Sequence, residues 1–183
     1  MARGLLVIDI QRDYFPGGAF PLVGPEEAAE VARALLDGFR DGGEPVVHLR
    51  HVWDSPDAPF MRPGTPGVEI HPLVAPATGE RVIDKANPNG FLGTNLAEVL
   101  HGQGIDHLCV VGMMTSMCVD ATVRAASDLG FTVTVVHDGC AAPDLEFGET
   151  AVPAAMVQGA FMAALADGYA TVVSGRELLA ATG

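Results

Sequence analysis

The chain has 183 residues, of which 49% are hydrophobic and 18% are charged, and its formal net charge is −13. This composition is typical of a globular protein, so we interpret residues 1–183 as one domain. So acidic a chain cannot neutralise many phosphates, which excludes nucleic acid and anionic membrane surfaces as expected partners.

The first half of the chain predicts two strands, a helix and a long loop. Gly4–Ile10 is a nearly continuous apolar run, which is typical of a strand buried on both faces. A helix opens at Pro25, where the missing N–H costs nothing, carries an apolar face at helical spacing and ends before Gly42. Glu44–His51 is the second strand. Residues 53–79 contain six prolines and little periodicity, and so predict a functional loop such as a lid or pocket wall.

The second half continues the alternation. The expected helices are Leu92–Gln103, Met117–Leu129 and Glu149–Asp167, and the expected strands are Arg81–Lys85, His107–Gly112, Phe131–His137 and Tyr169–Val173. This order predicts an α/β fold with three αβα layers, in which a six-stranded parallel sheet is flanked by helices. Ligands of such sheets bind beyond the carboxyl ends of the strands.

Three reactive side chains are expected at that edge. Asp9 is at the end of the first strand, Lys85 is at the end of the third, and Cys118 follows the fourth after a short turn. Lys85 is also the only lysine beside nine arginines. An acid, an ammonium and a thiol therefore converge, which is a pattern suited to nucleophilic catalysis.

Cys118 is the candidate nucleophile. Thr115 or Ser116 would serve as N-cap residue, which puts the thiol in the first turn of a helix. The helix dipole should lower its pKa from about 8.5 to near 7, and Lys85 should lower it further, while Asp9 should oppose this shift. Asp9 is then the group that accepts the thiol proton, and backbone N–H groups of the same turn can hold an oxyanion.

The other two cysteines fit structural roles. Cys109 lies inside a strand and should be inert, and Cys140 follows the fifth strand as a small, dry residue near the site. An odd number of cysteines indicates free thiols in a reducing compartment rather than a disulfide framework. The N-terminus lacks the layout of a signal peptide, and no apolar run approaches the roughly 20 residues of a membrane span, so we expect a cytoplasmic protein.

The chain resembles the isochorismatase-like cysteine hydrolases, which include nicotinamidases, N-carbamoylsarcosine amidase, ureidoacrylate amidohydrolase and streptothricin hydrolase. The resemblance covers essentially the whole chain, and it is specific only as a combination of motifs. These motifs are Leu6-Val7-Ile8-Asp9-Ile10-Gln11 with Gly17-Gly18, Gly64-Thr65-Pro66-Gly67-Val68-Glu69-Ile70, Val82-Ile83-Asp84-Lys85, Phe91-Leu92-Gly93-Thr94-Asn95-Leu96 and Val111-Gly112-Met113-Met114-Thr115-Ser116-Met117-Cys118-Val119.

The resemblance implies a catalytic triad of Asp9, Lys85 and Cys118. It also implies a cis peptide between Met113 and Met114, with the Met114 and Cys118 N–H groups forming the oxyanion hole. Homodimers or larger homo-oligomers are expected as well. The run Gly-Met-Met-Thr-Ser-Met-Cys is most similar to streptothricin hydrolase-like members. One departure is Gln158 in the last long helix, where the family pattern leads us to expect His.

The expected function is hydrolysis of an amide, lactam or carbamoyl C–N bond of a small molecule, through a thioester and without a cofactor. Gln11, Phe15, Trp53 and Phe91 are the candidate substrate-binding residues.

Three alternatives stay open. Nicotinamidases carry histidines that bind a metal, but His48 and His51 should face opposite sides of their strand, so no metal site is expected, although His51 should line the pocket. An isochorismatase would cleave a vinyl ether, for which a cysteine is not required in some relatives. A small-molecule-binding protein on a degenerate hydrolase fold is the non-enzymatic alternative, which the presence of all three triad residues disfavours.

Overall fold

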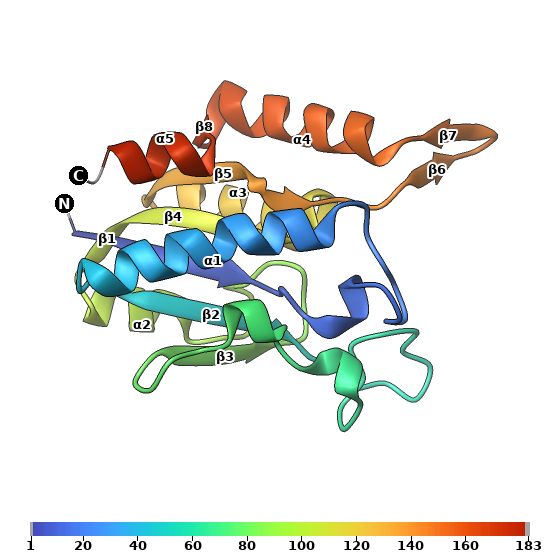
Figure 1. Cartoon of the computed structure of the whole chain (residues 1–183), viewed down its shortest axis with the longest axis horizontal. Helices are drawn as coiled ribbons and strands as arrows, with labels where there is room; N and C mark the ends of the chain where they lie inside the picture. Colours follow the sequence, from blue (N-terminus) through green and yellow to red (C-terminus); the bar gives the residue numbers. More distant parts are fainter. Residues whose placement is uncertain (1, 182–183) are drawn as a thin grey trace.

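A six-stranded parallel sheet forms the centre of the computed structural model, which describes residues 2–181 (Figure 1). Its strands are β1 (Ala2–Ile8), β2 (Val46–His51), β3 (Arg81–Lys85), β4 (Ile105–Met113), β5 (Thr132–Ala141) and β8 (Thr171–Val173). Their spatial order is β3-β2-β1-β4-β5-β8, and every neighbouring pair is parallel. The predicted α/β fold is confirmed.

Helices cover both faces of the sheet, so the fold has the three expected layers. On one face α1 (Pro25–Asp41) and α5 (Gly175–Ala180) pack over a core that contains Leu5, Val7 and Leu178. On the other face lie α2 (Leu96–Gly102), α3 (Asp120–Asp128) and α4 (Ala154–Gly168). Figure 1 shows α1 crossing in front of the strands, with α2 and α3 behind them.

The helix α1 illustrates how the sequence forms an element. Pro25 occupies its first turn, and Leu35, Leu36 and Phe39 on its apolar face are fully buried. Burial of each such side chain contributes about 1.5–3 kcal/mol, so this one face accounts for much of the docking of α1 on the sheet.

The second half differs from the prediction in several places. The helix expected from Glu149 begins at Ala154, because residues 145–152 form an antiparallel hairpin of β6 (Leu145–Phe147) and β7 (Thr150–Val152) that extends away from the sheet (Figure 1). The helix expected from Leu92 begins at Leu96, since residues 92–95 form a turn. The short helix α5 was not anticipated, although Ser174 and Glu177 form a capping box at its start.

No helix among residues 2–181 has the length and apolar character needed to cross a membrane.

The strand order changes direction between β1 and β4, which places a crevice beyond their carboxyl ends. Gly112, near the end of β4, allows the two strands to approach there. It has a φ of +152°, and a Cβ on it would lie 2.3 Å from the carbonyl oxygen of Ile8. Asp9 follows β1 directly and Cys118 follows β4 in a short turn, so both lie at this switch point.

Candidate active site

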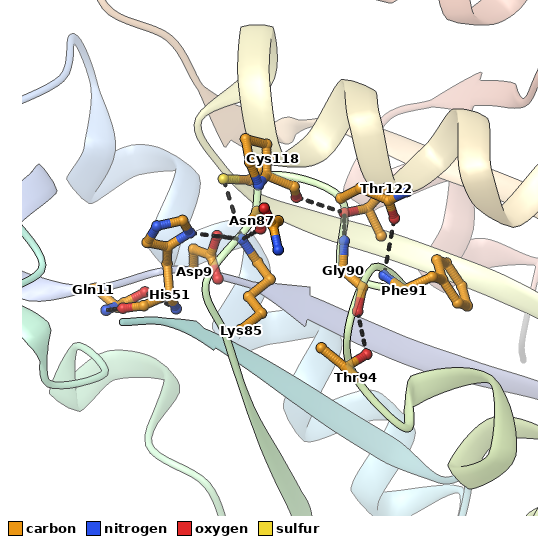
Figure 2. Close-up of polar contacts among 12 residues, drawn as sticks. Asp9, Gln11, His51, Lys85, Asn87, Gly90, Phe91, Thr94, Cys118 and Thr122 are labelled. Carbon is orange, nitrogen blue, oxygen red and sulfur yellow. Dashed lines mark hydrogen bonds and ion pairs between the residues drawn. The ribbon is translucent and has the colours of Figure 1, made fainter. Parts of the chain in front are cut away.

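Asp9, Lys85 and Cys118 are in direct contact (Figure 2). Lys85 Nζ lies 2.6 Å from Asp9 Oδ2 and 3.3 Å from Cys118 Sγ. All three side chains are buried. The structure therefore brings together, from three strands, the acid, the ammonium and the thiol that the sequence placed at one edge of the sheet.

The Lys85 ammonium has four acceptors for its three protons. Besides Asp9 and Cys118, Nζ lies 3.1 Å from Nδ1 of His51 and donates to the backbone carbonyl of Asn87 at 3.0 Å. Burial alone would lower the pKa of Lys85, but Asp9 and then Cys118 outweigh it and raise the pKa above its ordinary value. Lys85 is thus a fixed cation whose donors are fully engaged.

Asp9 is held by the backbone in an uncommon conformation. Its φ is +49°, a left-handed value that Asp adopts more readily than most residues. Its side chain is 0% exposed, and its Oδ1 atom accepts no hydrogen bond from residues 2–181. One carboxylate oxygen thus pairs with Lys85, while the other is free to exchange a proton.

Cys118 lies in a π-helical turn, Thr115–Val119, that precedes α3. The expected side-chain N-cap is wrong, because Met114 takes the N-cap position without a side-chain hydrogen bond. The Thr115 hydroxyl instead lies 2.6 Å from Oε1 of Gln158 and 3.1 Å from the carbonyl oxygen of Ala141, so it ties the turn to α4 and β5.

The contact with the Thr115 hydroxyl shows what Gln158 does at the position where His was expected. Gln158 Nε2 donates to the carbonyl of His137 at 2.8 Å, which turns its Oε1 toward the Thr115 hydroxyl. Gln158 therefore supports the turn that carries the thiol, and it does so with one donor and one acceptor.

The ionisation of Cys118 differs from the expectation. Burial, and next the Asp9 carboxylate, raise the pKa of the thiol well above its ordinary range, and Lys85 opposes them only in part. The turn is buried and a carboxylate faces the sulfur, and these two effects outweigh the stabilisation that Lys85 gives the thiolate. The thiol is protonated at rest, so its use as a nucleophile requires a base.

The Met113–Met114 peptide bond is cis. It joins the end of β4 to the π-helical turn, and the Met114 carbonyl accepts hydrogen bonds from the N–H groups of Met117 and Val119.

A cavity of about 250 Å³ opens onto Cys118. Rings, methionines and proline dominate its walls. The lining residues are Tyr14, His51, Trp53, Phe60, Ala86, Pro88, Met114, Met117 and Cys118. The long loop contributes Trp53 and Phe60, so it forms a wall of the cavity as expected.

Of the four expected substrate-binding residues, Trp53 lines this cavity and the other three lie elsewhere. Gln11 uses its amide to bind the backbone of His51 and Val68. Phe15 stacks on His71 with ring centroids 3.8 Å apart. These positions correct the expectation for both residues, because Gln11 holds the backbone of the cavity-lining His51 and Phe15 packs against His71, which does not line the cavity.

Phe91 requires the same correction. Its ring packs toward Phe131, with centroids 5.9 Å apart, and its backbone belongs to a turn in which Gly90 binds the Thr122 hydroxyl. Figure 2 shows Phe91 pointing away from the triad.

Two further aromatic residues line the cavity, Tyr14 and Phe60, and neither is among the residues predicted from the sequence. Tyr14 is adjacent to Phe15, but a short 3₁₀ turn, Arg12–Tyr14, decides which of the two rings faces the sulfur. Phe60 is positioned through Met61, whose N–H donates to Asp13 Oδ2 at 2.6 Å and whose φ is +56°. Both facts depend on loop geometry, which periodicity does not report.

Asp9, His51 and Cys118 are also the one group of three potential metal ligands that lie within 4.8 Å of one another in the described part of the chain. Lys85 Nζ contacts all three, so its ammonium already holds the position that a cation would take. His48 is separate from this group, because its Nε2 lies 2.9 Å from Glu80 Oε2. The donor set therefore does not fit a metal ion while Lys85 is present.

Comparison with known proteins agrees with this geometry. The model of the isochorismatase domain matches residues 3–173. The uncharacterized isochorismatase family protein YddQ of Bacillus subtilis is 49% identical over 172 residues, which cover 94% of this chain and 96% of that protein. A streptothricin hydrolase of Streptomyces noursei is 38% identical over 90% of this chain, which spans 60% of that longer protein.

Solved structures give the same assignment. A crystal structure from Oleispira antarctica, described as that of an isochorismatase hydrolase, has a TM-score of 0.95 and 50% sequence identity, and the match covers 98% of this chain and 96% of that one. The chain therefore belongs to the isochorismatase family and is a hydrolase of that family.

Proposed function

We propose that the chain is a cysteine amidohydrolase that opens a C–N bond of a small molecule through a thioester on Cys118. The observation that carries the proposal is the contact of Lys85 Nζ with both Asp9 Oδ2, at 2.6 Å, and Cys118 Sγ, at 3.3 Å, at the base of a cavity. Streptothricin hydrolase and maleamate amidohydrolase, which is 36% identical over 149 residues, are relatives named for hydrolytic chemistry of this class.

The first half-reaction forms the acyl-enzyme. Asp9 accepts the thiol proton of Cys118, and the sulfur adds to the substrate carbonyl carbon. The negative charge that develops on the carbonyl oxygen is held by the backbone N–H groups of Met114 and Cys118. The C–N bond then breaks as Asp9 returns its proton to the nitrogen, so that an amine or ammonia leaves.

The second half-reaction is hydrolysis of the thioester. Asp9 takes a proton from a water molecule, whose oxygen adds to the acyl carbon, and the S–C bond breaks as the thiol regains a proton. Lys85 stays charged throughout, because its raised pKa favours the ammonium. It stabilises the negative charge as this moves between Asp9 and Cys118, in a site where burial strengthens such interactions.

The test combines turnover with capture of the intermediate. Substrate and hydroxylamine are added to the wild type, and the hydroxamate product reports the thioester. Cys118→Ala should abolish hydrolysis and hydroxamate formation, Asp9→Asn should lower kcat by at least about 100-fold, and Cys140→Ala serves as the control for loss of a buried thiol. Turnover retained in Cys118→Ala would refute the covalent route.

A further inference from the structure

The hairpin of β6 and β7 presents an aromatic ring to solvent. Phe147 is 85% exposed, and Leu145 on the same hairpin and Met156 at the start of α4 are exposed as well. We propose that the hairpin and α4 form an interface with a second copy of the chain, in which Phe147 of each copy inserts into a hollow beside α4 of the other. The inference concerns a surface outside the cavity of Cys118, and it does not depend on the proposed function.

The hairpin is an amphipathic ribbon. Leu145 pairs with Val152 and Phe147 pairs with Thr150, so these four side chains share one face of the ribbon. Glu146 lies on the opposite face, because side chains alternate along a strand. A hairpin of two strands is only marginally stable in water by itself, so a surface that covers its apolar face would stabilise it.

The hollow that would receive the ring lies beside α4 and β8 and has a volume of about 340 Å³. Gly159, Ala163 and Ala166 line it from one face of α4, since they follow one another at helical spacing. Met162 and Val172 add further apolar surface, and no Asp, Glu, Lys or Arg within residues 2–181 lines the hollow. An apolar cavity of about 150 Å³ is enough to hold a benzene ring, so this hollow can accept the ring of a phenylalanine.

Gly159 is an independent sign that a group from outside packs here. A glycine in the middle of a helix destabilises it relative to alanine, so such a glycine usually has a packing reason. A Cβ on Gly159 would meet nothing within 4 Å, so packing within the described chain does not require the glycine. A ring that enters the hollow from a second molecule would require it, because only glycine lets another group come so close to the helix backbone.

The charge of the chain favours a second copy as the partner at this surface. Each copy has a net charge of −13, so two copies can approach closely only through a surface without acidic side chains. Residues 154–166 of α4 contain no charged residue, and a helix that is apolar all round is normally buried. The exposed residues of the hairpin and α4 also approach the roughly 20–30 residues a side of a standard interface.

The direction of the hairpin allows each copy to reach the other. The hairpin projects beyond the N-terminal end of α4, whereas β8 follows the C-terminal end (Figure 1). Phe147 therefore points away from the hollow of its own chain. A two-fold axis that pairs the two α4 helices antiparallel brings each hairpin to the hollow of the other copy, and such an interface is closed because both copies use the same surface.

Analytical ultracentrifugation of the full chain measures the oligomeric state and the Kd of the dimer. Phe147→Ser should raise this Kd at least about 100-fold, since two rings are lost from each dimer. Gly159→Leu should raise it as much, because the new side chain fills the hollow, while leucine favours a helix and keeps α4 folded, as circular dichroism would verify. Leu92→Ser is the control: it removes an apolar side chain that is 57% exposed and lies outside this surface, and it should leave the Kd unchanged.

Cross-linking tests the contact itself. Phe147→Cys and Ala163→Cys are mixed in equal amounts and treated with a short bismaleimide, and peptide mass spectrometry should find position 147 linked to position 163 of the other copy. Leu92→Cys mixed with Ala163→Cys should give no such link. A wild type that stays monomeric at the highest concentration that can be sedimented would overturn the proposal and leave the surface to a different protein. An assembly whose Kd changes in neither or only one of Phe147→Ser and Gly159→Leu would overturn the insertion of Phe147 into the hollow.

Discussion

Removal of the Lys85 ammonium should destabilise the protein, and neutralisation of Asp9 should restore part of the loss. In Lys85→Met the apolar stem is kept, but Asp9 loses its 2.6 Å partner in a site from which water is excluded. An unpaired buried charge of this kind costs about 3–5 kcal/mol of unfolding free energy. Asn is tolerated at the left-handed φ of +49° that Asp9 adopts, so Asp9→Asn removes the charge without strain in the backbone.

The assay is urea unfolding of four proteins at pH 7, followed by circular dichroism: the wild type, Lys85→Met, Asp9→Asn and the double variant. The double variant should be more stable than Lys85→Met, with a coupling free energy of about 2–3 kcal/mol, near the upper end for residues in contact. Arg50→Met is the control, since the Arg50–Asp84 pair is solvent-exposed and should cost less than about 1 kcal/mol. A cost below 1 kcal/mol for Lys85→Met, or simple additivity of the two substitutions, would refute this reasoning.

Three further outcomes are expected. Burial raises the pKa of Glu80, but the hydrogen bonds from Arg40 and other donors lower it to about 2. The stabilisation by Glu80 is therefore complete above pH 4.5 and disappears as the pH falls toward 2. In Glu80→Gln the unfolding free energy should fall less steeply over this acidic range, and an unchanged fall would exclude Glu80 as its source. Iodoacetamide should alkylate Cys118 before the fully buried Cys109, as followed by peptide mass spectrometry. The alkylation rate of Cys118 should still rise above pH 9, and a rate that reaches a plateau below pH 8 would contradict the raised pKa. Lys85→Ala should gain Zn²⁺ binding, measured by calorimetry, because three potential ligands remain within 4.8 Å of one another. If neither the variant nor the wild type gives a heat of Zn²⁺ binding, the ligands cannot rearrange around an ion.

The sheet and the triad could be predicted because they depend on local patterns. Nearly continuous apolar runs mark buried parallel strands, and the residue that follows such a run lies at the carboxyl edge whatever the loops do. Asp9, Lys85 and Cys118 are such residues, and each was identified from its position at or after a strand.

The cavity wall could not be predicted in the same way. Whether Tyr14 or Phe15 faces the sulfur depends on one 3₁₀ turn, and the place of Phe60 depends on the hydrogen bond between Met61 and Asp13, which are 48 residues apart. The pKa of Cys118 differs from the prediction for a related reason, since a sequence shows the helix start but not the depth at which it is buried.

The engagement of Lys85 with Asp9, His51 and Cys118 has a consequence for the lifetime of the protein. Unlike a bound metal ion, the Lys85 ammonium is part of the chain, so it is always present in the site and no chelator can remove it. It carries one charge where zinc carries two, and a thiol coordinated to zinc is deprotonated outright. Cys118 beside Lys85 instead has a raised pKa and keeps its proton, whereas oxidation to sulfenic and higher acids begins from the thiolate. The arrangement therefore protects the resting sulfur against oxidation.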